Sequence, residues 1–108
     1  MLQRTKPPSL AELRTLLGAF CQKHRLRRLD IFGTAARGLA TADSDVDMLV
    51  TTDSARPPST SELLEMAGEA EELVGVPVDF VLRSSLEKSP NPYFREHILA
   101  TAVCVYGS

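Results

Sequence analysis

The stretch from Leu29 to Val50, LDIFGTAARGLATADSDVDMLV, contains two apolar runs separated by a turn rich in small residues. The first run ends at Gly33-Thr34, and the second begins at Ser44-Asp45-Val46-Asp47. Short apolar runs bounded by glycine, serine and aspartate are typical of β-strands. We therefore expect two strands joined by a turn, with two carboxylates at the head of the second strand.

The two carboxylates are expected to share one face of that strand. Side chains alternate along a strand, so Asp45 and Asp47 project together, while Val46, Met48 and Val50 project into a core. Carboxylates side by side repel each other unless a cation lies between them. Mg²⁺ is the natural candidate, because it prefers oxygen ligands and is commonly held by carboxylates together with substrate phosphates.

A third carboxylate, Asp79, lies in the apolar segment VPVDFVL. If this segment forms a strand beside the one that contains Asp45 and Asp47, the three acids can approach one another. Three acids around one point can hold two metal ions about 4 Å apart, which is the arrangement used in phosphoryl transfer.

The Gly33-Thr34 turn provides the groups that bind phosphate. A glycine lets the backbone approach a phosphate closely, and a threonine at the start of a helical turn offers its hydroxyl and its N–H. Arg37, three residues further on, can face the same anion. The pair and the acids together, 11 residues apart in this order, are more specific than either feature alone.

The remaining chain predicts an α/β (α+β) fold, a small mixed β-sheet backed by helices on one side. Residues 1–8 form a lead-in, and capping boxes at Ser9 and Ser59 start two helices. The segment 83–92 is expected to be a polar connection, and the basic run 23–28 is either a solvated helix end or a patch for a triphosphate or an acidic partner. The expected elements are helices over 9–25, 59–74 and from Asn91 on, strands over 26–32, 45–50 and 76–82, and a short strand or extended tail over 103–106. The apolar residues expected to face the core are Leu63, Leu64, Ala67, Ala70 and Val74 in the second helix and Phe94, Ile98 and Leu99 in the last.

The composition narrows the function classes. The chain has 108 residues, 44% of them hydrophobic, and a formal net charge of -2. These values predict one domain over 1–108 and argue against extensive nucleic-acid binding, which usually needs a basic surplus. No apolar run approaches the roughly 18 residues that a membrane span requires. Cys21 and Cys104 are expected to be free thiols, consistent with a cytoplasmic protein.

Residues 33–38 (GTAARG), followed by residues 44–50 (SDVDMLV), resemble the signature of the DNA polymerase beta-like nucleotidyltransferase superfamily. The resemblance is greatest to the minimal nucleotidyltransferases (MNT), and it extends to the Val78–Val81 strand and the final helix. That family usually has serine where this chain has Thr34, which keeps the hydroxyl.

The resemblance implies an enzyme and assigns roles to its site residues. Gly33, Thr34, Arg37 and Ser44 would bind the nucleotide, and the three motif acids would be catalytic and hold Mg²⁺, with two ions expected. The expected acids are Asp45, Asp47 and Asp79.

The expected reaction is transfer of AMP from ATP to a hydroxyl of a protein partner. The resemblance implies that the acceptor is a tyrosine of a HEPN ribonuclease toxin, and that the chain is the antitoxin of a type VII toxin–antitoxin pair. Two alternatives stay open. The protein could neutralise its partner by steric occlusion without catalysis, or it could modify a small molecule or an RNA.

Overall fold

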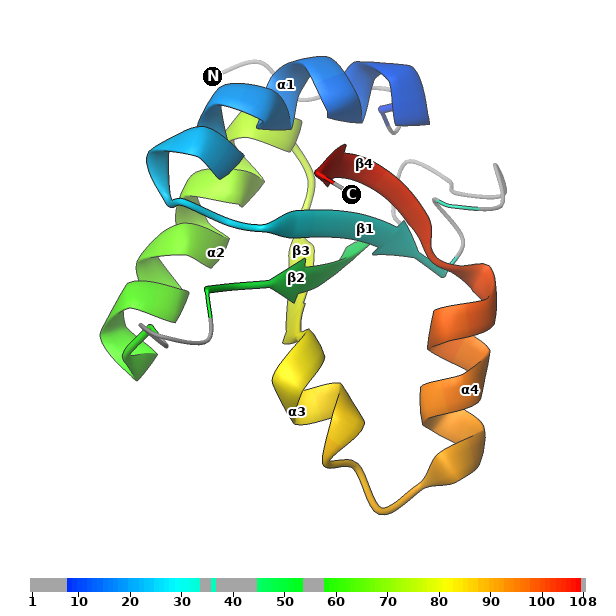
Figure 1. Ribbon diagram of the computed structural model, residues 1–108. Helices are drawn as coiled ribbons and strands as arrows, with labels where there is room; N and C mark the ends of the chain where they lie inside the picture. The colour runs from blue at the N-terminus through cyan, green and yellow to red at the C-terminus, as the bar shows by residue number, and fades with distance from the viewer. Residues whose placement is uncertain (1–7, 34–35, 37–44, 54–57, 108) are drawn as a thin grey trace.

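A computed structural model describes residues 8–33, 36, 45–53 and 58–107 of the chain. These residues form a four-stranded mixed sheet with strand order β3-β2-β1-β4 and helices on both of its faces (Figure 1). The elements are α1 (Leu10–Lys23), β1 (Arg28–Phe32), β2 (Val46–Thr51), α2 (Thr60–Val74), β3 (Val78–Leu82), α3 (Arg83–Glu87), α4 (Pro92–Thr101) and β4 (Val103–Gly107).

The helix starts follow from local chemistry. Ser9 and Ser59 each accept a hydrogen bond from the backbone N–H three residues on, and the glutamate there bonds back to the serine N–H. Both predicted capping boxes are therefore confirmed. Gly75 ends α2 in the left-handed conformation, with φ 77°.

The first strand begins two residues later than expected, because α1 ends in a Schellman motif. The Leu26 N–H donates to the Cys21 carbonyl at 2.9 Å, and the Arg25 N–H donates to the Gln22 carbonyl at 3.2 Å. Arg25 takes the left-handed position of this motif, with φ 54°. The chain can therefore enter the sheet only after Leu26.

The main core lies between one face of the sheet and helices α1 and α2 (Figure 1). Val46, Met48 and Val50 of β2 are buried there, as the alternation predicted. The prediction for α2 was partly wrong, because Met66 is buried and Leu64 is 70% exposed. The helix turns its Met66–Ala70–Val74 row toward the sheet, and these residues recur at the spacing of one helical face.

The opposite face of the sheet has its own small core, so the expectation of helices on one side only was wrong. Phe32 and Leu49 pack there against Leu86 of α3 and Ile98 of α4. The helix α3 was predicted as a polar connection, since only Leu86 among its five residues is buried. The predicted inward positions of Phe94 and Leu99 were also wrong, because these side chains are 43% and 42% exposed.

The terminal segment is a strand, β4, which pairs antiparallel with β1. Cys21 and Cys104 are free, as predicted, and burial raises the pKa of the Cys21 thiol to about 12. None of the helices within the described part of the chain has the length and apolar character needed to cross a membrane.

A buried ion pair joins the second core to the strands. Asp30 is 1% exposed and accepts hydrogen bonds from Arg28 Nε and Nη2 at 2.7 and 3.1 Å. Arg83, the first residue of α3, lies 3.9 Å from the same carboxylate and donates to Thr51 Oγ1 at 3.0 Å. The contacts of Arg83 with Asp30 and Thr51 therefore hold the start of α3 against β1 and β2.

Asp30→Ala is expected to lower the free energy of unfolding by about 2 kcal/mol, because it removes the buried acceptor of Arg28 and the counter-ion of Arg83. The value is at the low end of such changes, since Arg28 is about one-third exposed and can turn toward water. Urea denaturation measures the change. Glu96→Gln, which alters an exposed acid on α4, is the control and should leave the unfolding midpoint unchanged.

Candidate active site

The strand register brings two of the predicted acids together. Strands β2 and β3 are parallel, and Asp47 lies directly opposite Asp79. Neighbouring strands are about 4.8 Å apart, and residues in register share a face. The expected pairing of the two strands is therefore present. Asp45 is exposed and directly precedes β2, which begins at Val46 rather than at Asp45 as predicted.

The surroundings of Asp47 are unfavourable for its negative charge. Its pKa is raised above the usual value of an aspartate, first by burial and then by the negative charges of Asp79 and Asp45. The charged form is thus destabilised by the fold itself. A cation near these carboxylates would relieve the repulsion.

Gly33 borders the Asp47 carboxylate from β1. It directly follows Phe32, the residue opposite Asp47 in the antiparallel β1–β2 pair. Gly33 has φ 74°, and a Cβ at this position would overlap Asp47 Oδ2. The backbone conformation at this position favours glycine, and any larger residue would have to displace the Asp47 carboxylate.

Three of the predicted nucleotide-binding residues, Thr34, Arg37 and Ser44, lie outside the described residues. Thr34 follows Gly33 in the chain, and Ser44 precedes Asp45. Sequence reasoning did not single out Phe32 and Leu49, which form the apolar border of the acids. Leu49 lies two residues after Asp47 on the strand, so both side chains lie on the same face. The apolar residue at this position could have indicated that part of the face is covered.

The chemistry of the site suits a hard metal ion. Carboxylate oxygens are the ligands that Mg²⁺ prefers, and the mutual repulsion at Asp47 favours a bound cation. Within residues 8–33, 45–53 and 58–107, no group of three or more His, Cys, Asp or Glu side chains is gathered closely enough to hold a metal. The strand register thus pairs two carboxylates, Asp47 and Asp79, and Asp45 would have to turn toward them for all three acids to reach one ion.

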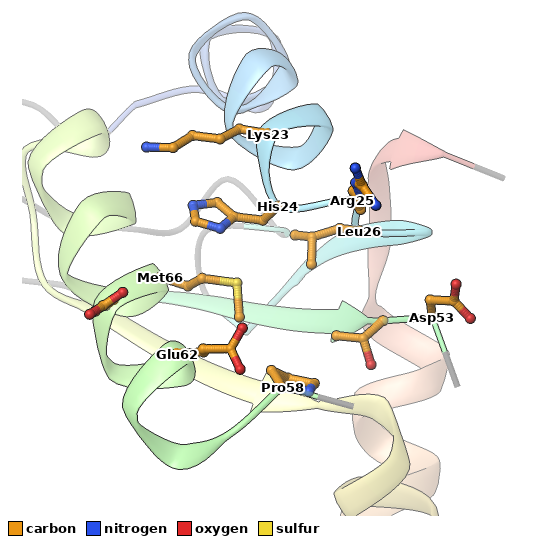
Figure 2. A pocket seen from close by; sticks show the side chains of 10 residues that line it. Lys23, His24, Arg25, Leu26, Asp53, Pro58, Glu62 and Met66 are labelled. Carbon is orange, nitrogen blue, oxygen red and sulfur yellow. The ribbon is translucent and has the colours of Figure 1, made fainter. Parts of the chain in front are cut away.

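A cavity of about 370 Å³ lies elsewhere, beyond the end of α1 (Figure 2). Figure 2 shows Lys23 and His24 on one side of it and Glu62 and Met66 of α2 on the other. The cavity also borders Thr52 and Asp53, which follow the last residue of β2, whereas Asp47 is near the first. It is therefore separate from the carboxylates.

The basic run 23–28 is not part of the carboxylate site. It ends at Arg28, the first residue of β1, whereas Gly33 follows the last residue of that strand. Lys23 Nζ and His24 Nε2 lie 2.9 and 3.2 Å from Glu69 Oε1 on α2, and Arg28 pairs with Asp30. The hypothesis that this run is a patch for a triphosphate or an acidic partner stays a prediction, at a place apart from the carboxylates.

Comparison with known proteins shows the family to which this chain belongs. The model of the nucleotidyltransferase domain family matches residues 13–108. The protein adenylyltransferase MntA of Thermococcus cleftensis is 37% identical over 83 residues, which cover 73% of this chain and 82% of that protein. The chain therefore belongs to the nucleotidyltransferase family.

Solved structures place it more closely, among the minimal nucleotidyltransferases. One structure assigned to that group is 32% identical, with a TM-score of 0.66 over 88% of this chain and 94% of the other. Toxin–antitoxin complexes share the fold. A chain of a toxin–antitoxin structure with AMP-PNP has a TM-score of 0.66 at 19% identity, covering 92% of this chain and 73% of the matched chain. Another such structure contains a tri-AMPylated HEPN toxin of Shewanella oneidensis with its MNT antitoxin, with a TM-score of 0.65 at 14% identity, covering 92% of this chain and 73% of the matched chain.

Gly33→Ala is expected to reduce nucleotidyl transfer about 100-fold, because the new methyl group displaces the Asp47 carboxylate and misplacement of about 1 Å can cost that much. The positive φ adds a stability cost of about 1 kcal/mol. Incorporation of labelled nucleotide measures the first effect, and thermal unfolding the second.

Gly68→Ala is the matched control for this substitution. Gly68 lies within α2, and a Cβ there would meet nothing within 4 Å. This variant should keep full activity and gain up to about 1 kcal/mol of stability from the better helix propensity of alanine. Equal activity of both variants would show that Gly33 is not part of the site.

Proposed function

We propose that the protein is a Mg²⁺-dependent adenylyltransferase that transfers AMP from ATP to a tyrosine hydroxyl of a HEPN toxin. By this modification the protein would act as the antitoxin. The observation that carries this proposal is the register pair Asp47–Asp79, with Gly33 against the Asp47 carboxylate. The relatives support the acceptor class, since one is named a protein adenylyltransferase and another structure contains an AMPylated HEPN toxin.

The proposed roles follow the positions of the residues. Asp45, Asp47 and Asp79 would hold the metal ions, and Gly33, Thr34, Arg37 and Ser44 would bind the triphosphate. Bound Mg²⁺ would neutralise the phosphate charge and stabilise the leaving pyrophosphate. Catalysis would rest on positioning and charge stabilisation, because phosphoryl transfer needs little covalent chemistry from the protein.

The reaction balances as a substitution at the α-phosphorus of ATP. The acceptor oxygen forms the new P–O bond, and the bond to the bridging oxygen of pyrophosphate breaks. Asp79 is exposed and lies on the same face as Asp47, so it is placed to receive the proton of the acceptor hydroxyl. The products are the adenylylated partner and pyrophosphate.

The test is the mass of a co-expressed HEPN partner, measured with ATP and Mg²⁺. Wild-type protein should add whole adenylates, and the double variant Asp47→Asn/Asp79→Asn should lower the rate by about 100-fold or more. Undiminished modification by this variant would refute the assignment of the site.

The variant also separates catalysis from occlusion. If Asp47→Asn/Asp79→Asn protects cells from the toxin as well as wild type does, neutralisation works by binding alone. Thermal unfolding in the absence of metal checks that the variant is folded. Because the fold raises the pKa of Asp47, its charged form costs stability at neutral pH, so a neutral asparagine should leave the unfolding midpoint equal to or above that of wild type.

A further inference from the structure

Most side chains of helix α4 are not buried by the rest of the chain. Of its ten residues only Ile98 is buried. Tyr93 is 81% exposed, and Phe94 and Leu99 are 43% and 42% exposed. These three account for most of the exposed large hydrophobic side chains in the described part of the chain, the others being Leu64 and Leu73 of α2.

The N-terminal end of α4 is capped by its own residues. Pro92 occupies the first turn, and the Asn91 side chain accepts from the N–H groups of Tyr93 and Phe94 at 3.1 and 3.3 Å. Along its length, Arg95 Nη1 donates to the Glu87 carbonyl at 3.4 Å. A helix this short is marginal in water unless an apolar face is packed. The exposed aromatic residues are therefore suited to burial against another molecule.

The position of α4 indicates which molecule that is. Helices α3 and α4 pack on the face of the sheet that contains Asp47 and Asp79, through Leu86, Ile98 and Leu49. Helices α1 and α2 cover the opposite face (Figure 1). A protein that presents a hydroxyl to Asp47 and Asp79 must therefore approach on the side from which α4 projects.

We infer that α4 is the docking surface for the acceptor protein, with Tyr93 and Phe94 as its anchors and Leu99 at its margin. This inference rests on the proposed function and names the surface that the proposed partner covers. Aromatic side chains bury a large area at a small entropic cost, and they dominate the binding energy of many interfaces. The partner should offer an apolar surface that receives the two rings.

The experiment uses the full chain and, as the probe, the purified HEPN protein whose adenylylation tests the proposed function. Tyr93→Ala/Phe94→Ala removes both rings, and alanine suits a helix. The variant should raise the Kd for the probe at least about tenfold, which is a typical loss for an interface anchor. The KM for the probe should rise in parallel, with kcat unchanged at saturating probe, because the rings do not touch the reacting groups.

Leu64→Ala is the matched control, since Leu64 is 70% exposed but lies on α2, over the opposite face. It should leave Kd, KM and kcat unchanged. Tyr93→Glu is the second variant and should weaken binding in the same way. Phe94 stays in place there, and an acidic residue in the first turn suits the helix dipole. Circular dichroism checks that all variants fold.

Three results would overturn the docking surface. In the first, the α4 variants bind the probe as tightly as Leu64→Ala does and are equally active. In the second, they lose kcat at unchanged Kd. In the third, native mass spectrometry finds that the isolated chain is a dimer that Tyr93→Glu dissociates, so that a second copy covers α4. The proposed function fails separately: wild type would then bind the probe through α4 but add no adenylate, and Asp47→Asn/Asp79→Asn would bind equally well.

Discussion

The site depends on one constraint, the parallel register of β2 and β3. It sets Asp47 beside Asp79 in the sheet, where burial and like charge make the ionised form of Asp47 unfavourable. Gly33, directly after β1, lies against the Asp47 carboxylate, and a side chain there would have to displace that carboxylate. The fold thus holds a repulsive group in place, and such strain is common where a ligand completes the structure.

One face of the sheet carries the main core, and the other face carries the acids of the candidate site. The face under α1 and α2 carries most of the buried apolar side chains. The other face is covered only in part, by Leu86 of α3 and Ile98 of α4. Asp79 therefore stays exposed while Leu49, two register positions further along on β2 and β3, is fully buried. A single sheet can provide a core and an accessible row of acids because its side chains alternate.

The sequence predicts those features that depend on neighbours in the chain. The capping box at Ser9 could be predicted because all its groups lie within one turn. That Asp79 lies beside Asp47 could be predicted only on the condition that their strands pair, since pairing is set by the whole sheet. The helix around Leu86 could not be predicted, because Leu86 is its only buried residue and packs against Leu49, which lies far away in sequence. Apolar residues on α4 were assigned to the core for a related reason: helical spacing marks an apolar face but not what covers it.

The most direct measurement is a crystal structure of the protein with Mn²⁺, as an anomalous substitute for Mg²⁺, and a non-hydrolysable ATP analogue. The account predicts anomalous density bound by oxygens of Asp47 and Asp79, with the triphosphate against Gly33. Nucleotide in the cavity between Lys23 and Met66, or metal density away from the two carboxylates, would contradict it.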